Sequence, residues 1–305
     1  MHRRLFLGAA AAILLSVPAM AADKPVIAYV VKEINPYFNV MLAGAEAEAA
    51  KLGVELKTSA AASQTAVEQQ MGIVEDFISQ SVDAIVIAPI DSKALVPVVA
   101  RAMKAGIKVV NVDNRLDADT MKAAGIEVPY VGVNDEVSAY NAAKAIVDKL
   151  GGTGKVAILE GIRGADNAQA RKRGAEKAFA EAPGIEIIAS QTANWQAEEA
   201  LNVMTNIIQA NPDINGVFAA NDMMSFGVIQ AVAAAGKEGK VVIASIDAED
   251  QAKANIKDGK ALATVYQNQD AQAAKAVSVA LEMINGATVD PDIQVDTILL
   301  MAADL

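Results

Sequence analysis

Apolar positions along the chain follow two patterns, short continuous runs and longer segments in which apolar residues recur every three or four positions. Residues 25–31 form a continuous run, which predicts a strand buried on both faces. Residues 36–52 are predicted to form a helix that ends at Gly53, because glycine readily takes the left-handed conformation that closes many helices. Residues 65–81 place four apolar side chains on one helical face, namely Val67, Met71, Val74 and Ile78.

The same two patterns continue to the end of the chain. Further strands are predicted at residues 54–59, 83–90, 107–113, 130–133, 155–160, 185–190, 216–220, 241–247, 262–267 and 297–301. Further helices are predicted at residues 92–105, 135–150, 167–181, 197–210, 223–235, 249–257 and 271–285. Strands rich in Val, Ile and Ala that are joined by helices are typical of parallel sheets with helices on both faces, so we predict an α/β fold.

A strand–helix–strand unit recurs in the two halves of the chain. Residues 84–113 and residues 216–247 each contain a strand, a helix and a second strand, and the second strands end in Asp113 and Asp247. A chain of 305 residues is also longer than one hydrophobic core usually supports. We therefore expect two doubly wound parallel-sheet lobes of like fold, related by pseudo-symmetry.

Residues 1–21 have the pattern of a secretory signal peptide. His2, Arg3 and Arg4 form a basic start, residues 5–17 are apolar, and Ala19-Met20-Ala21 is a cleavage site of the small-x-small type. A transmembrane anchor is the alternative, but the apolar run is too short to cross about 30 Å of hydrocarbon comfortably. We expect export of the chain and a mature N-terminus near Ala22.

The composition of the mature chain disfavours several classes of function. Without Arg3 and Arg4, 24 basic side chains remain of 26 and stand against 37 acidic ones, a formal charge of −13 that disfavours nucleic acid and anionic membrane surfaces as partners. The single histidine is His2, and there is no cysteine. The mature chain therefore offers no imidazole or thiolate for catalysis, no His/Cys metal site and no disulfide. We predict no catalytic residue, no metal and no cofactor.

Polar and aromatic side chains gather where the predicted strands end. Ligands of open parallel sheets bind outside the carboxyl ends of the strands, so these positions are the candidate binding residues. They are Lys32, Asn35, Tyr37, Phe38, Asp113, Asn114, Asn167, Arg171, Trp195, Asn221, Asp247 and Gln267. Carboxylates accept hydrogen bonds, ammonium and guanidinium groups donate them and amides do both, so the set suits the hydroxyl groups of a neutral sugar.

Some of these positions have a second interpretation. Asp91 and Asp222 each follow a strand and precede a helix, where aspartate often serves as the helix N-cap. The adjacent aromatic residues Tyr37 and Phe38 could equally belong to the hydrophobic core. The case for a binding site rests on the shared location of the candidate residues and not on any one of them.

The sequence resembles the ribose- and allose-binding proteins, which are periplasmic receptors of ABC-type sugar importers. The resemblance covers essentially the whole mature chain and rests on short segments that are specific only together. They are Asn35-Pro36-Tyr37-Phe38, Val112-Asp113, Ala170-Arg171-Lys172-Arg173-Gly174 and residues 189–195, 201–204, 218–222 and 263–267.

The resemblance implies roles for most of the candidate residues. The positions that match hydrogen-bonding residues of the family are Asn35, Asp113, Arg171, Asn221, Asp247 and Gln267. The positions that match its aromatic walls are Tyr37, Phe38 and Trp195. Lys32 matches a lysine of the allose-type branch, and residues 161–171 have the length found in that branch.

The chain also departs from the pattern of the family. One residue fewer separates Lys32 from Asn35, and Asn114 stands where the ribose type has arginine. Tyr37 and Phe38 replace the Phe and Trp of the allose type. The identity of the sugar therefore stays open among aldohexoses, aldopentoses and sugar alcohols.

The fold implied by the resemblance is that of a type I periplasmic binding protein, with two lobes and a hinge of three segments. The N-terminal lobe would contain residues 22–133 and 269–294, and the C-terminal lobe residues 134–268 and 295–305. The chain would cross between the lobes near residues 131–134, 267–270 and 293–296. We expect a monomer in the periplasm that closes around one sugar or sugar alcohol and delivers it to the membrane subunits of an ABC importer. A chemoreceptor is a further partner compatible with this role.

Two other classes of protein compete with this interpretation. An exported sugar-acting enzyme could use a pair of carboxylates such as Asp113 and Asp247, although the chain lacks a mature histidine. A regulator of the lactose-repressor type shares the fold but needs an N-terminal helix-turn-helix and a basic surface. The predicted signal peptide and the charge of −13 argue against the regulator.

Overall fold

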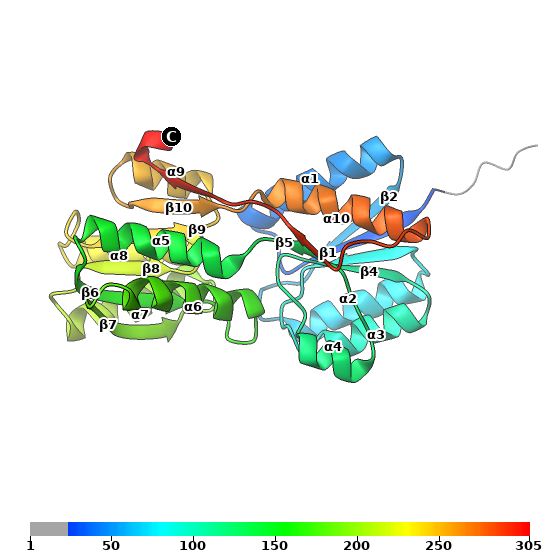
Figure 1. Cartoon of the computed structure of the whole chain (residues 1–305), viewed down its shortest axis with the longest axis horizontal. Coiled ribbons are helices and arrows are strands. Elements are labelled where there is room, and N and C mark those ends of the chain that lie inside the picture. The colour runs from blue at the N-terminus through cyan, green and yellow to red at the C-terminus, as the bar shows by residue number, and fades with distance from the viewer. Residues whose placement is uncertain (1–23) are drawn as a thin grey trace, which may run out of the picture.

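The computed structural model describes residues 24–305, and the predicted signal peptide lies outside this range. Two six-stranded sheets form the centres of two α/β lobes, which lie end to end in Figure 1. This confirms the predicted fold class and the repetition of one fold in the two halves. None of the helices in this part of the chain combines the length and the apolar character that crossing a membrane requires.

The sheet of the first lobe is parallel throughout. Its strands, in order across the sheet, are β2 (Glu55–Ala60), β1 (Val26–Val31), β3 (Ala84–Ile87), β4 (Lys108–Val112), β5 (Tyr130–Gly132) and β11 (Asp292–Gln294). Alternate residues of β1 enter different cores, because successive side chains of a strand point to opposite faces. Tyr29 packs with α1 (Pro36–Leu52) and α10 (Gln269–Ile284), whereas Ala28 and Val30 pack with α2 (Val67–Ser79) and α3 (Val96–Lys104).

The sheet of the second lobe repeats this order of connections. Its strands are β7 (Gly184–Thr192), β6 (Thr153–Glu160), β8 (Gly216–Ala219), β9 (Val242–Ile246), β10 (Ala263–Tyr266) and β12 (Ile298–Met301). The helices of this lobe are α5 (Asp135–Lys149), α6 (Asp166–Ala180), α7 (Ala197–Ala210), α8 (Asp222–Ala234) and α9 (Asp250–Lys257). The edge strand β12 runs antiparallel to β10, which differs from the all-parallel expectation.

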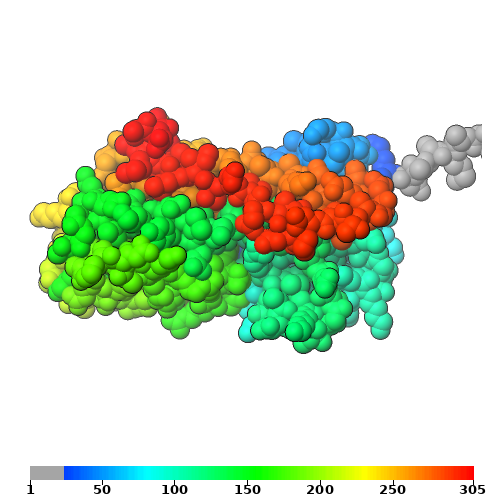
Figure 2. Space-filling model, in the orientation of Figure 1, coloured from blue at the N-terminus to red at the C-terminus, as the bar shows by residue number. Residues whose placement is uncertain are grey.

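Three connections join the two lobes. The chain leaves the first sheet after β5, returns to the first lobe after β10 and passes from β11 to β12 near its end. Figure 1 shows the last of these as a red ribbon that runs from one lobe to the other. In Figure 2 the segment toward the C-terminus lies over both lobes on the face in view.

Three elements were not predicted from the sequence, one of which is the three-residue 3₁₀ helix η1 (Ala302–Asp304). The helix α4 (Ala118–Ala124) is short and has no buried residue, so it leaves no apolar periodicity. The strand β11 has only three residues, Asp292, Ile293 and Gln294, and none of them is buried. Most other predicted boundaries differ from the observed ones by a few residues at the element ends, where capping decides the terminus.

Close helix contacts in the second lobe depend on glycine. A Cβ atom on Gly174 of α6 would lie 2.1 Å from the carbonyl oxygen of Glu136 in α5. A Cβ atom on Gly227 of α8 would lie 2.1 Å from the carbonyl oxygen of Ala197 in α7. These helix pairs therefore approach more closely than any larger residue would permit.

We expect Gly174→Ala to lower the free energy of unfolding by about 1–3 kcal/mol, because the methyl group forces α6 away from α5. Gly72→Ala is the matched control, since Gly72 lies in α2 and a Cβ atom there would meet nothing within 4 Å. The control should raise stability by up to about 1 kcal/mol through helix propensity alone. Urea unfolding of both variants would measure this, and equal effects of the two would contradict the proposed contact.

Candidate functional site

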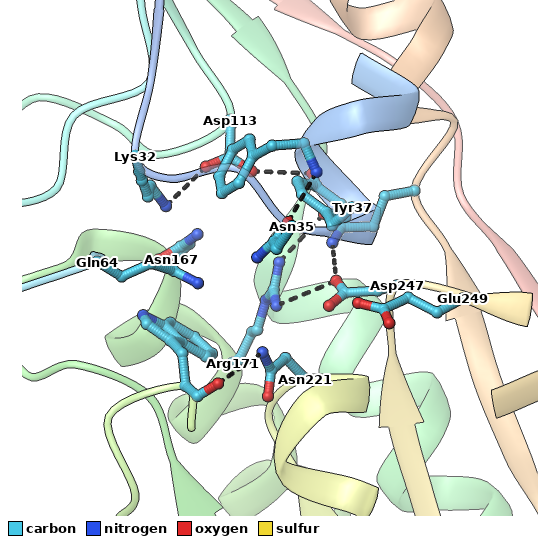
Figure 3. Close-up of a pocket in the computed structure, with 13 residues that line it drawn as sticks. Lys32, Asn35, Tyr37, Gln64, Asp113, Asn167, Arg171, Asn221, Asp247 and Glu249 are labelled. Carbon is cyan, nitrogen blue, oxygen red and sulfur yellow. Dashed lines mark hydrogen bonds and ion pairs between the residues drawn. The ribbon is translucent and has the colours of Figure 1, made fainter. Parts of the chain in front are cut away.

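A cavity lies between the carboxyl ends of the two sheets, with an empty volume of about 340 Å³. The residues that line it are Lys32, Asn35, Tyr37, Phe38, Gln64, Asp113, Asn167, Arg171, Trp195, Asn221, Asp247, Glu249 and Gln267. All the candidate residues from the sequence except Asn114 are therefore brought together in one place (Figure 3).

Asp113 is the centre of the wall that the first lobe contributes. The ammonium group of Lys32 lies 2.7 Å from its Oδ2, and the hydroxyl of Tyr37 donates to its Oδ1 over 2.9 Å. The backbone oxygen of Asp113 accepts from the hydroxyl of Tyr130 over 3.0 Å. Burial, reinforced by the nearby charge of Asp113, raises the pKa of Tyr37 well above its usual value, so the phenol stays a donor. These contacts fix the direction in which the carboxylate points.

Hydrogen bonds hold both the oxygen and the nitrogen of the Asn35 side-chain amide. Its Oδ1 accepts from the backbone N–H of Phe38 over 2.9 Å and so caps α1, while its Nδ2 donates to Glu33 over 2.9 Å. The same Oε1 of Glu33 accepts from Gln64, also over 2.9 Å. Glu33 therefore orients two amides at the edge of the cavity.

Aromatic rings from the two lobes form apolar parts of the wall. The rings of Tyr37 and Phe38 meet edge to face, with centroids 5.0 Å apart. Trp195 comes from the other lobe and packs against Gly161, where a Cβ atom would lie 2.1 Å from the indole. The guanidinium carbon of Arg171 lies 5.5 Å from the centroid of the indole ring.

Arg171 organises the wall of the second lobe. Its Nε donates to Asp135 over 2.7 Å, one terminal nitrogen donates to the carbonyl of Ala220 over 2.8 Å, and the other donates to Gln267 over 3.1 Å. Asp247 lies 3.8 Å from the guanidinium and accepts a hydrogen bond of 2.7 Å from Gln267. One buried cation thus faces two buried carboxylates.

Burial sets the charge balance of this wall. Desolvation raises the pKa of Asp135 to about 6, although the charge of Arg171 acts in the opposite direction. Desolvation also raises the pKa of Asp247 well above its usual value, again against the effect of Arg171. The guanidinium opposes both shifts, because a neighbouring positive charge favours the ionised form of each carboxylate.

The two residues at the start of α8 divide the tasks of capping and support. Asn221 is the N-cap, since its Oδ1 accepts from the backbone N–H of Met224 over 2.9 Å. Asp222 lies behind the cavity, where it accepts from the hydroxyls of Ser245 and Thr264 and from the backbone N–H of Glu249. Burial raises the pKa of Asp222 to about 6.

Two residues of the cavity wall carry buried acceptors that no other group of residues 24–305 satisfies. These acceptors are Oδ1 of Asn167 and Oε1 of Glu249. Buried acceptors without a partner are rare in folded proteins, so they indicate a place where a ligand's donors belong. Hydroxyl groups are donors of the kind that would satisfy them.

Asn114 differs from its sequence prediction. Its side chain is fully buried outside the cavity, where Nδ2 donates to the carbonyl of Pro89 over 2.8 Å and its Oδ1 accepts from the backbone N–H of Asn167 over 3.1 Å. The chain turns sharply at Asp113, whose φ is 64°, so the two neighbouring side chains point to different places. Asn114 connects the lobes instead of lining the cavity.

Gln64 and Glu249 were missed by the sequence analysis. Gln64 lies in the loop between β2 and α2, several residues beyond the strand end that marked the other candidates. Glu249 immediately precedes α9 and was assigned to the start of that helix.

Asp91, the other candidate helix cap, accepts from the backbone N–H groups of Lys93 and Ala94. Within residues 24–305 no group of His, Cys, Asp and Glu side chains has an arrangement that could hold a metal.

Comparison with known proteins assigns the chain and its fold to one family. Residues 27–288 match the periplasmic binding protein domain. The chain is 40% identical over 270 residues to the D-allose-binding periplasmic protein of Escherichia coli, which covers 88% of this chain and 86% of that protein. It is 38% identical over 278 residues to the D-ribose/D-allose-binding protein of Pseudomonas aeruginosa, which covers 90% of this chain and 87% of that protein.

Solved structures agree with these relatives. An ABC transporter periplasmic solute-binding protein from Actinobacillus succinogenes, solved with bound D-allose, superposes with a TM-score of 0.88 at 44% identity and covers 92% of this chain and 99% of its own. A solute-binding protein from Bacillus halodurans with bound myo-inositol superposes with a TM-score of 0.84 at 30% identity and covers 92% and 96%. These relatives are binding proteins of transport systems, which confirms the prediction that the chain is not an enzyme.

We expect Arg171→Met to lower the free energy of unfolding by about 3–5 kcal/mol near neutral pH, because it leaves Asp135 and Asp247 buried without their cation. The loss should be smaller at about pH 5.5 than at about pH 8. Arg171 lowers the pKa of both carboxylates against the effect of burial, so its removal raises their folded pKa values further, and protonation then neutralises the buried charges of the variant as the pH falls. Urea unfolding across this range would measure the difference.

Arg171→Lys is the control, because it keeps a positive charge at the same place. It should lose less stability than Arg171→Met and show a weaker dependence on pH. A pH-independent loss in Arg171→Met would show that the guanidinium acts by packing and not by its charge.

Proposed function

The chain belongs to the periplasmic binding protein family, and from this premise we propose that it captures one monosaccharide between its lobes and delivers it to an ABC importer. The ligand class is an aldose similar to allose or ribose. The observation that supports this most directly is the cavity itself, where oriented carboxylates, amides and cations from both lobes surround a space of about 340 Å³. The family of the chain supports a role in transport, and the side chains of the cavity support a polyhydroxylated ligand.

The groups of the cavity suit vicinal hydroxyls. A hydroxyl both donates and accepts, and the walls offer acceptors such as Asp113 and Asp247 beside donors such as Lys32 and Arg171. The rings of Phe38 and Trp195 provide apolar surfaces for the C–H faces of a sugar ring. A cyclic sugar alcohol is the second candidate, because the structurally similar protein from Bacillus halodurans was solved with myo-inositol.

Hydrogen bonds between the lobes support closure as the mechanism. The backbone N–H of Ser92 donates to the carbonyl of Gly164 over 3.0 Å, and Oγ of Ser92 accepts from the backbone N–H of Asp166 over 2.9 Å. Asn114 accepts from Asn167 in the same region. We take the structure to be the closed form of a two-state hinge, in which ligand contacts from both lobes shift the population toward closure.

The moving bodies follow from the three connections between the sheets. We propose that residues 22–133 with 269–294 move against residues 134–268 with 295–305. The hinge segments would be residues 131–134, 267–270 and 293–296, where the chain passes between the sheets. We further propose that residues 1–21 direct export to the periplasm, that the mature protein is a monomer and that the importer's membrane subunits recognise the closed form. A chemoreceptor could use the same form.

A thermal-shift screen of the mature protein against aldohexoses, aldopentoses and cyclic and linear polyols tests the proposed function. A ligand that binds only the native state stabilises it by about 2.7 kcal/mol at a concentration one hundred times its dissociation constant. We expect an aldose to give the largest shift and to be recovered chemically unchanged. No shift with any of these compounds, or recovery of a converted product, would contradict the proposal.

With the sugar from that screen, we expect Asp113→Asn and Asp247→Asn each to weaken binding about ten- to a hundredfold. Each change removes a charge-assisted acceptor from the cavity, which is worth about 1.5–3 kcal/mol. Asp119→Asn is the control, because Asp119 is exposed on α4 and does not line the cavity. Calorimetric titration would measure the affinities, and unchanged values in both cavity variants would exclude this site.

We expect Asn114→Ala to weaken sugar binding about tenfold, mainly through faster dissociation, although Asn114 does not line the cavity. The change removes the hydrogen bond to Asn167 and so destabilises the closed form. Asn215→Ala is the control, because its amide accepts from Lys155 within one lobe. Stopped-flow measurement of dissociation would separate the two, and equal rates in both variants would argue against a role in closure.

A further inference from the structure

Glu249 is a buried carboxylate whose side chain takes part in none of the contacts described so far. Its side chain lines the cavity, the residue is 7% exposed, and Oε1 has no hydrogen-bond partner among residues 24–305. Figure 3 shows the carboxyl end turned toward Asp247 and the cavity. A buried acid with a free oxygen at the edge of a binding cavity is a candidate for direct contact with a ligand.

The position of Glu249 is set by its backbone. Its N–H donates to the buried carboxylate of Asp222 over 2.8 Å, and the N–H of Ala248 donates to Thr264 over 3.1 Å. Asp247 and Ala248 both have positive φ, 131° and 57°, in a turn that non-glycine residues rarely adopt. The fold thus holds an unfavourable turn that brings the carboxylates of Asp247 and Glu249 to the same cavity.

Glu249 also separates the cavity from a second hollow. A groove with an empty volume of about 1290 Å³ lies on its other side, lined by Pro36 and Val40 of the first lobe and by residues of the second, including Tyr266 and Leu300. Glu249 lines both spaces. Its side chain therefore forms the wall between the cavity and the groove, and we call it the partition. Under the closure proposed above, this side chain is buried only when the lobes are closed.

The charged groups that raise the pKa of Glu249 are the acids Asp222 and Asp250, and a third acid, Asp247, lines the same cavity. Two cations are also nearby, but each has acidic partners of its own. Arg171 is bound to Asp135 and Asp247 in the cavity, and Lys253, which lines the groove on the other side of Glu249, is paired with Asp250. Burial, followed by the charges of Asp222 and Asp250, raises the pKa of Glu249 to about 7. Near neutral pH the side chain can therefore either donate or accept a hydrogen bond.

We propose that Glu249 is a specificity-determining residue that hydrogen-bonds a hydroxyl group at one end of the ligand and excludes ligands with a substituent there. The inference rests on the function proposed above and adds to it a choice among sugars. An unsubstituted hydroxyl satisfies the free oxygen of Glu249. An O-methyl group at the same position cannot donate and would collide with the partition.

The experiment uses the sugar that gives the largest thermal shift with the unmodified protein and its mono-O-methyl derivatives. Glu249→Ala should bind the parent sugar about tenfold more weakly, and its affinity for one derivative relative to the parent sugar should rise about tenfold or more. Glu249→Gln keeps the size of the side chain, so it should still exclude that derivative. Asp250→Asn is the matched control, because it removes the next carboxylate, which is fully exposed.

The pH dependence of affinity provides a second measurement. Opening the lobes hydrates Glu249 and lowers its pKa, so closure takes up a proton and binding should strengthen as the pH falls from about 8 to about 6. Asp135, Asp222 and Asp247 also have raised pKa values and contribute to this slope. The slope near neutral pH should therefore become smaller in Glu249→Gln without vanishing, and it should change less in Asp250→Asn, which lowers the pKa of Glu249 but keeps its carboxyl group.

Two results would overturn the inference. The first is a Glu249→Ala variant that keeps both the affinity for the parent sugar and the discrimination against every derivative. The second is a Glu249→Gln variant with the same pH slope as the unmodified protein. Either result leaves the proposed function intact, because the unmodified protein still binds the sugar. A protein that binds no sugar or polyol contradicts the proposed function itself.

Discussion

The ionic contacts of Arg171 connect the hinge region of this protein to its cavity. Asp135 begins the first helix after a proposed hinge segment, whereas Asp247 ends a strand at the cavity wall, and both face the same guanidinium. Without that cation, two carboxylates would be buried with nothing to offset the loss of hydration. The second lobe can therefore bury acceptors for hydroxyl groups only because Arg171 lies behind them, and every other contact of this wall is arranged around that requirement.

The first lobe also balances a buried carboxylate, but with different residues. Asp113 occupies the position equivalent to Asp247, at the end of the fourth strand in its sheet, and is balanced by Lys32 and the phenol of Tyr37. Both aspartates have positive φ, which turns their carboxylates out of the strand direction and toward the space between the sheets. The pseudo-symmetry of the lobes thus places the two aspartates in equivalent positions, whereas the side chains that balance their charges differ between the lobes.

The sequence predicts the fold well because buried parallel strands and amphipathic helices each leave a periodic pattern. It predicts most of the cavity because parallel strands end at one edge of a sheet, which places residues such as Asp113 and Asp247 together. The prediction fails for residues whose position does not depend on the end of a strand. Gln64 belongs to a loop, and the turn at Asp113 sends Asn114 away from the cavity. The antiparallel direction of β12 also escapes prediction, because an apolar pattern reads the same in both directions.

The unsatisfied acceptors explain how a ligand can control closure. Under the closure that we propose, Oδ1 of Asn167 and Oε1 of Glu249 become buried away from water, and each unsatisfied acceptor costs about 1–3 kcal/mol. In the closed form that we propose, the hydrogen bonds of Ser92 and Asn114 across the lobes offset part of this cost. A ligand whose hydroxyls satisfy both acceptors removes the penalty only in the closed form. That difference in free energy between the two forms is what a binding protein needs in order to report its occupancy through its shape.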